Sequence, residues 1–150
     1  MNTDFLEILR ALRDAEARFL VVGAYAVAVH GHPRATGDLD IWVEATPENA
    51  GKVFRALRGF GAPLADLKES DLSEPGLVFQ MGRPPRRIDL ITSASGISFE
   101  ESYKRRVSGR FGDLSCPVVG LDDLIANKRA TGRHKDLADA EALELLRRGE

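Results

Sequence analysis

The chain has 150 residues, of which 43% are hydrophobic and 29% are charged, and its formal net charge is −2. A chain of this length and composition is expected to fold without disulfides or structural metals, which excludes a disordered or cysteine-rich protein. No stretch approaches the roughly 18 consecutive apolar residues of a membrane span, and the N-terminal residues lack a signal-peptide pattern. We therefore expect a cytoplasmic protein with no membrane partner.

Hydrophobic periodicity, capping residues and turn formers divide the chain into short elements. Helices are expected where apolar residues recur every three or four positions, and strands where they alternate or run together. In chain order we expect a helix at 4–17, a strand at 19–22, a helix at 24–29, a strand at 38–43, a helix at 47–60, a long loop at 61–76, strands at 77–81 and 87–91, a short helix after Ser98, one or two strands within 107–119, and helices at 121–131 and 135–148. This order predicts a mixed β-sheet flanked by helices, in one α/β or α+β domain over 1–150. Its core would span about 19–120, and its C-terminal helical tail about 121–148.

Local signals mark several of the predicted boundaries. Thr3 is the expected N-cap of the first helix, and Thr46 followed by Pro47 is an N-cap with a proline at the first helical position. Ser98 opens a capping box ahead of the short helix. Segment 61–76 is rich in Gly, Pro, Asp and Ser, so we expect a loop without core residues.

Three aspartates carry the clearest chemical signal. Asp38 and Asp40 open a predicted strand, so their carboxylates share one face and lie roughly 6.5–7 Å apart. Asp89 lies in an apolar strand, where an uncompensated charge would be costly. Carboxylates that repel one another favour a hard divalent cation, and three of them favour the two cations of many phosphoryl-transfer enzymes. Taken singly, each motif is also explained by solvated or ion-paired acids at a strand end.

A glycine turn joins the strand at 19–22 to the helix that follows. The free N–H groups after Gly23 and Ala24 can hold phosphate, although the turn has neither a dinucleotide-binding nor a P-loop pattern. Residues 83–135 hold eleven basic against six acidic side chains, which favours either a phosphate-bearing ligand or a solvated surface. A transition-metal site at His30 and His32 with Asp38 is a weaker alternative, because no third nitrogen or sulfur ligand accompanies the two histidines.

Three motifs together resemble the nucleotidyltransferase superfamily related to DNA polymerase beta. They are a strand ending in Gly23-Ala24, then Asp38-Leu39-Asp40, then Arg87-Ile88-Asp89-Leu90-Ile91. The later segments 123–128 and 133–139 are similar to its small members, the minimal nucleotidyltransferases and the AbiEii-type toxins. The resemblance covers roughly residues 19–140, and its specificity lies in the combination of motifs.

The resemblance implies an enzyme that uses Mg²⁺ or Mn²⁺ to transfer an NMP from an NTP to a hydroxyl of RNA or tRNA, a protein or a small molecule. It implies that Asp38, Asp40 and Asp89 are the catalytic residues and the metal ligands. It further implies nucleotide or phosphate contacts from Gly23, Ala24, Arg34, Lys128, Arg133 and Lys135. Within the toxin branch, a cognate toxin or antitoxin chain would be the partner.

Three alternatives remain open within this interpretation. The family usually has Gly or Ser at the position of Ala24, so a hydroxyl contact to the triphosphate is absent here. A nucleotide-binding or antitoxin module of the same fold, without turnover, is therefore the alternative function. Lys128 is either a phosphate ligand or an exposed helix lysine, and Asp136 and Asp139 either orient basic residues or form a solvated face.

Overall fold

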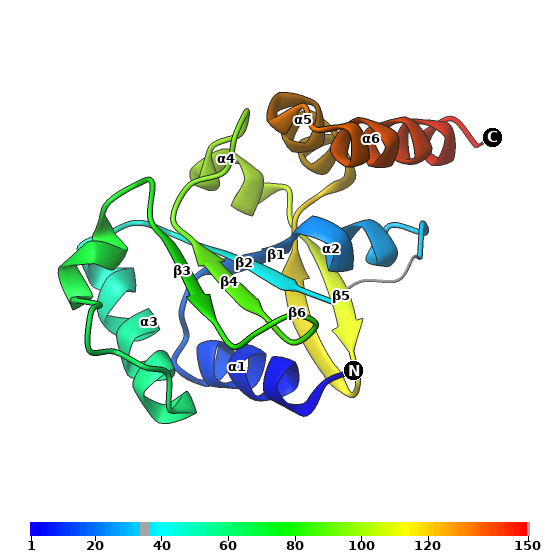
Figure 1. Cartoon of the computed structure of the whole chain (residues 1–150). Helices are drawn as coiled ribbons and strands as arrows, with labels where there is room; N and C mark the ends of the chain where they lie inside the picture. The colour runs from blue at the N-terminus through cyan, green and yellow to red at the C-terminus, as the bar shows by residue number, and fades with distance from the viewer. Residues whose placement is uncertain (34–36, 150) are drawn as a thin grey trace.

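A computed structural model describes residues 1–33 and 37–149 of the chain. Its central feature is a mixed sheet with the strand order β3-β4-β2-β1-β6-β5 (Figure 1). The strands are β1 (Phe19–Val22), β2 (Leu39–Val43), β3 (Val78–Met81), β4 (Ile88–Ile91), β5 (Val107–Phe111) and β6 (Leu114–Val118). The pairs β2–β4 and β1–β6 are parallel, and the other neighbours are antiparallel. The predicted mixed sheet flanked by helices is confirmed.

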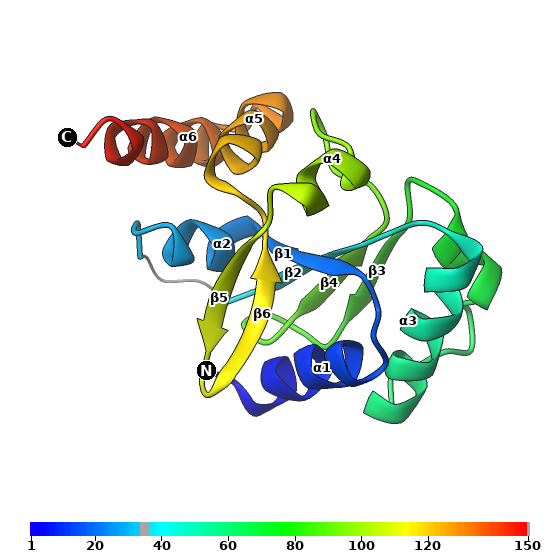
Figure 2. The same ribbon diagram turned by 180° about the vertical axis from the view of Figure 1, so that it is seen from behind.

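Helices cover both faces of this sheet. They are α1 (Thr3–Asp14), α2 (Gly23–Val29), α3 (Pro47–Phe60), the 3-10 helix η1 (Glu69–Ser73), α4 (Phe99–Lys104), α5 (Leu121–Thr131) and α6 (His134–Arg147). α1 and α3 lie on one face, whereas α2, α4 and α5 lie over the other, and α6 runs from α5 towards the C-terminus (Figures 1 and 2). None of the helices within the described residues is both long and apolar enough to cross a bilayer.

Strand β2 serves both the core and the polar face of the sheet. Leu39, Ile41 and Val43 are fully buried, and the alternation of a strand directs them to the α1–α3 side. The same alternation directs Asp40 and Trp42 to the opposite side, where the Trp42 ring packs edge-on against Phe99 of α4, 5.1 Å between ring centroids. A single strand therefore anchors the core and presents an acidic side chain.

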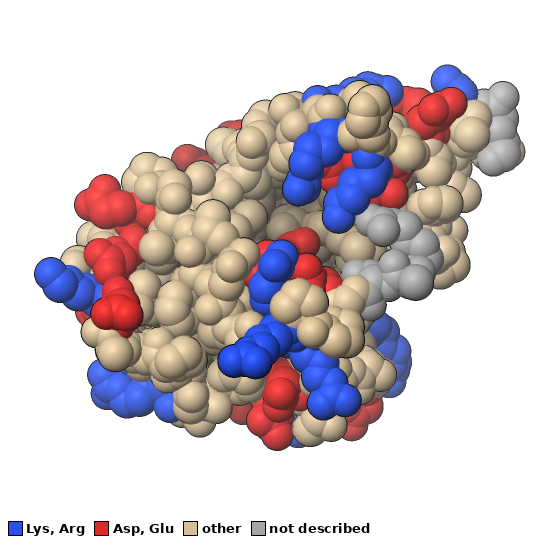
Figure 3. All heavy atoms as spheres, viewed as in Figure 1, with Lys and Arg blue, Asp and Glu red and all other residues tan. Residues whose placement is uncertain are grey.

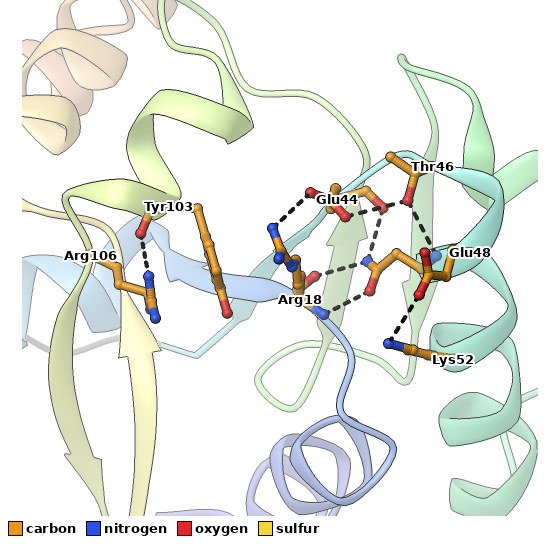
Figure 4. A network of polar contacts seen from close by, with 8 residues as sticks. Arg18, Glu44, Thr46, Glu48, Lys52, Tyr103 and Arg106 are labelled. Atoms are coloured by element: carbon orange, nitrogen blue, oxygen red, sulfur yellow. Dashed lines mark hydrogen bonds and ion pairs between the residues drawn. The ribbon is translucent and has the colours of Figure 1, made fainter.

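A polar network fixes the end of the β1–β2 pair that lies away from Asp40 (Figure 4). The buried Asn49 side chain accepts a hydrogen bond from the Arg18 N–H at 2.7 Å and donates to the carbonyls of Arg18 and Glu44 at 3.0 and 2.9 Å. Thr46 caps α3 by accepting from the Asn49 N–H, as predicted. The Arg18 guanidinium also lies over the Tyr103 ring. These contacts tie the start of β1, the end of β2, α3 and α4 into one frame.

The first helix begins and ends earlier than its sequence pattern predicts. Asn2, rather than Thr3, is the N-cap, because its side chain accepts a hydrogen bond from the Asp4 N–H at 2.7 Å. The helix ends at Asp14, and Glu16 follows with a left-handed φ of 59°. The predicted extension to residue 17 is therefore wrong.

Segment 61–76 contributes to the core, contrary to the prediction. Leu72 is fully buried and Leu67 is nearly so, and the 3-10 helix around Leu72 packs against α3. The turn-forming residues of this segment let the chain fold back, and the two leucines between them pack into the hydrophobic core. The composition of the segment did not indicate that these two leucines are buried.

Candidate functional site

Three aspartates from two neighbouring strands meet at one end of the sheet. The parallel register of β2 and β4 pairs Asp40 directly with Asp89, and Asp38 precedes β2 by one residue. Together they line an acidic pocket of about 190 Å³. The complete lining is Ala24, Gly37, Asp38, Asp40, Arg87, Asp89, Lys128, Arg133 and Lys135. The structure thus brings together all the predicted site residues except Gly23, which lies next to this pocket, and Arg34, which lies outside the described residues.

Gly23 is required by the position of the Asp40 carboxylate. Its φ is +68°, and a Cβ placed on it would lie 2.1 Å from Asp40 Oδ2. Because Val22 pairs with Asp40 across the β1–β2 ladder, the turn that follows must pass close to that carboxylate. Any side chain here would displace Asp40, so the glycine of the motif serves the acid as well as the turn.

Asp40 is the most perturbed acid of the site. The pKa of Asp40 is raised to about 6, mainly by burial and then by the negative charges of Asp89 and Asp38, while Lys128 and Arg87 oppose the rise. The carboxylate therefore lies in a place where a positive ligand would be favourable.

Arg87 is a site residue to which sequence reasoning gave no role. Its Nε lies 2.9 Å from Asp89 Oδ1, and its Nη2 lies 3.2 Å from Asp89 Oδ2 and 3.0 Å from Asp38 Oδ2. The hydrogen bond from Arg87 to Asp89 raises the pKa of the guanidinium, as do the charges of the aspartates around it. Arg87 and Asp89 are two positions apart at the start of a strand, so the alternation that paired Asp38 with Asp40 could have found it.

Lys128 is buried, in contrast to the alternative of an exposed helix lysine. Its Nζ lies 3.3 Å from Asp136 Oδ1 and 3.1 Å from Asp139 Oδ2, and both carboxylates are buried as well, so they do not form a solvated face. Burial alone would raise the pKa of Asp136, but hydrogen bonds from Arg133 and Thr131 and the charge of Lys128 together lower it. The α5–α6 pair therefore holds a fixed cation at the wall of the acidic pocket.

A second hollow adjoins the acidic pocket and shares Asp40, Lys128 and Arg133 with it. This adjoining cleft has about 340 Å³, and it contains Gly23. Its remaining lining is Val22, Val78, Ile91, Ser93, Ala94, Ser95, Asn127, Thr131 and Asp136. Figure 3 shows acidic atoms inside a hollow on this side of the molecule, with basic atoms on both sides of it. No motif in the sequence pointed to the 93–95 segment, because serines and alanines there carry no pattern.

The donor set of the acidic pocket suits a hard divalent cation. Three carboxylates line it, and the charge on Asp40 lacks a partner strong enough to restore its ordinary pKa. Within residues 1–33 and 37–149, no three His, Cys, Asp or Glu side chains already stand as a ready metal cage. Two of the three aspartates, Asp38 and Asp89, are instead ion-paired with Arg87. His30 is occupied elsewhere, because its Nε2 lies 2.7 Å from the Val119 carbonyl oxygen.

Solved structures of nucleotidyltransferases share this architecture, so the chain has the nucleotidyltransferase fold. TM1012 of Thermotoga maritima, a candidate nucleotidyltransferase, is 14% identical with a TM-score of 0.58, over 100% of this chain and 96% of that chain. The lincosamide antibiotic adenylyltransferase LnuA, bound to lincomycin, is 13% identical with a TM-score of 0.61, over 96% of each chain. The antibiotic-resistance factor ANT(2'')-Ia is 12% identical with a TM-score of 0.63, over 96% of this chain and 82% of that chain.

Sequence comparisons add nothing to this likeness. No protein-family model matches the chain, and no curated protein matches it. At these identities the shared feature is the fold. The toxin branch of the superfamily stays a prediction.

Proposed function

We propose that the protein is a nucleotidyltransferase that moves an NMP from an NTP to a hydroxyl acceptor. The observation that carries this proposal is the convergence of Asp38, Asp40 and Asp89 with Lys128 in one small pocket of a nucleotidyltransferase fold. Acids from the β2 and β4 segments and a cation from the α5–α6 pair converge there, although only Asp38 and Asp40 are near one another in sequence.

The three aspartates would hold Mg²⁺ or Mn²⁺. When bound, such a cation would supply countercharge to the phosphates and lower the pKa of an acceptor hydroxyl. Asp40 would be central to this role, because it lines both the acidic pocket and the adjoining cleft. Gly23 would keep the space around its carboxylate open.

The cations on the other wall would bind the triphosphate. Lys128 is held by two buried carboxylates and Arg133 by one of them, whereas Lys135 is exposed at the rim and can follow a mobile polyphosphate. The acceptor oxygen would form a bond to the α-phosphorus as the bond to the β-phosphate bridging oxygen breaks. Pyrophosphate would leave with the bonding pair, and the hydroxyl proton would pass to solvent.

A label-transfer assay tests this function. The protein is incubated with α-³²P-labelled NTPs and Mg²⁺ or Mn²⁺ in the presence of total RNA, candidate proteins or small hydroxyl compounds. We expect transfer by the wild type, none by the double variant Asp38→Ala with Asp40→Ala, and unchanged transfer by Asp66→Ala, an exposed acid outside the site. NTP binding without transfer, equal in the wild type and the double variant, would contradict the proposal.

The second candidate is a nucleotide-binding or antitoxin module without turnover, and Ala24 is the observation that favours it. Ala24 lines the acidic pocket with a methyl group, where a serine would offer a hydroxyl to a phosphate. The variant Ala24→Ser separates the two candidates. Transfer by the wild type supports the enzyme, whereas transfer that begins only in the serine variant supports the module.

The acceptor is the least constrained part of the proposal. LnuA, whose structure holds lincomycin, supports a small-molecule acceptor. Arg83 and Arg86 are exposed in the turn before β4, whose Pro85 lies beside Gly37, and their positive charge supports RNA or tRNA. A protein acceptor, such as a cognate toxin or antitoxin chain, is the third class. The assay above distinguishes the three by where the label is recovered.

A further inference from the structure

One guanidinium contacts two of the three acids in the acidic pocket. Arg87 contacts Asp89 through two nitrogens and Asp38 through one of them, at 2.9 to 3.2 Å. Because Asp38 directly precedes β2 and Asp89 lies within β4, Arg87 links the two strands near their N-terminal ends. Its positive charge therefore lies between the negative charges of Asp38 and Asp89.

The arginine pairs with two of the three carboxylates of the pocket. Three other cations line the pocket: Lys128 is paired with Asp136 and Asp139, Arg133 is paired with Asp136, and Lys135 is exposed. A divalent cation is therefore most favourable at the acid that Arg87 does not contact. Asp40, which has no contact with Arg87 among the ion pairs of the described residues, is the acid left to the cation.

The contact between Arg87 and Asp89 is close but imperfectly directed. Arg87 Nε and Asp89 Oδ1 lie 2.9 Å apart and are shielded from solvent, yet neither atom makes a directed hydrogen bond. The Arg87 side chain keeps 31% of its surface exposed, so it has a path out of the pocket. A phosphate is a good alternative partner for it, because guanidinium groups bind phosphate with two parallel hydrogen bonds.

We propose that Arg87 takes the place of one divalent cation in the nucleotide-free protein, so that the acidic pocket binds a single ion, centred on Asp40. Asp89 accepts a second ion only when Arg87 turns away, and the phosphates of an incoming nucleotide supply the partner that draws it. The identity of the ligands rests on the proposed function, but the competition between Arg87 and a cation does not.

Mn²⁺ binding without nucleotide tests the proposal directly. Calorimetry and electron paramagnetic resonance of free Mn²⁺ give the number of ions per chain and their affinities. We expect one ion on the wild type and on Arg86→Met, which alters the neighbouring exposed arginine, and a second ion, bound about tenfold more tightly than any second wild-type ion, on Arg87→Met. Two equal ions on the wild type, or no gain in a folded Arg87→Met protein, would overturn it.

Two further measurements keep the test sharp if Arg87→Met folds poorly. Arg87→Lys retains one positive charge but cannot contact both acids at once, so its second Mn²⁺ site should be of intermediate affinity. In the wild type, the ¹⁵Nε resonance of Arg87 should shift when Mg²⁺ and a non-hydrolysable NTP are added together, and stay in place with Mg²⁺ alone. A resonance that ignores the nucleotide, or a lysine variant that binds like the wild type, counts against the proposal.

The outcomes separate this inference from the proposed function. If Arg87→Met gains a second Mn²⁺ site but the protein never transfers label, the competition between Arg87 and a cation is supported and the proposed transferase function is contradicted. Label transfer together with unchanged Mn²⁺ stoichiometry in Arg87→Met would do the reverse.

Discussion

Replacing Asp40 with asparagine should stabilise the protein at neutral pH while abolishing nucleotide transfer. The pKa of Asp40 is raised from its ordinary value of 3.8 to about 6, mainly by burial and then by the charges of Asp89 and Asp38. The folded state therefore binds the proton more tightly than the unfolded state does. Stability from this group is fully present below pH 3.8 and is lost as the pH rises through about 6.

The size of the effect follows from the two pKa values. The gap between 3.8 and about 6 corresponds to about 3 kcal/mol of unfolding free energy lost by the wild type at pH 8. Asp40→Asn carries no charge at any pH and avoids this loss. For a chain of this length, about 3 kcal/mol raises the melting temperature by roughly 6–12 °C at pH 8.

Urea and thermal unfolding of both proteins between pH 3.5 and 8 would measure the difference. The curves should converge near the acid end and separate between pH 4 and 7, and Asp66→Asn, at an exposed acid, should follow the wild type throughout. Added Mg²⁺ should narrow the gap at pH 8 by stabilising only the wild type. An Asp40→Asn protein that is less stable than the wild type at pH 8, or a gap that does not change with pH, would refute the reasoning.

Three further substitutions test the frame of the site. Gly23→Ala combines a left-handed φ with displacement of Asp40, so it should cost about 2–4 kcal/mol of unfolding free energy and abolish transfer. The control Gly59→Ala in α3, where a Cβ meets nothing within 4 Å, should not destabilise the protein. Lys128→Met removes the buried cation that contacts both Asp136 and Asp139, and urea unfolding at pH 7 should show a loss of about 3–5 kcal/mol that shrinks at acid pH. Asn49→Ala removes three buried hydrogen bonds to backbone and should cost about 2–4 kcal/mol by the same measurement, with little change in Mn²⁺ affinity.

Strand patterns predicted the local part of the site. The two-residue period of β2 placed Asp38 and Asp40 on the side away from Leu39 and Ile41, and the apolar run around Asp89 marked a strand. What the pattern lacked was the pairing of Asp40 with Asp89, because the register between two strands is a property of the folded sheet. The resemblance to a family supplied that neighbourhood in advance, and the coordinates give it a physical basis.

The helical half of the site was harder to predict. Burial of Lys128 depends on the α5–α6 pair, which turns at Gly132 with a φ of +70° and brings Asp136 and Asp139 back over the lysine. Apolar spacing says which side of α5 faces the sheet, but it does not say that the polar side meets two acids of α6. The same limit hid Leu72, whose burial requires a loop to fold back onto α3.

The two walls of the acidic pocket come from parts of the fold that are built differently, and this division bears on how the site would work. The acids belong to strands whose neighbours on both sides fix them, whereas the cations belong to a helix pair whose principal contacts are with each other. We therefore expect a negatively charged ligand between the walls to draw the less constrained wall, α5 and α6, towards the sheet. Because Lys128 is tied to Asp136 and Asp139 within that pair, the lysine would move with its counterions and retain its geometry. Arg87, fixed to the opposite wall, would remain with the acids until phosphate arrives.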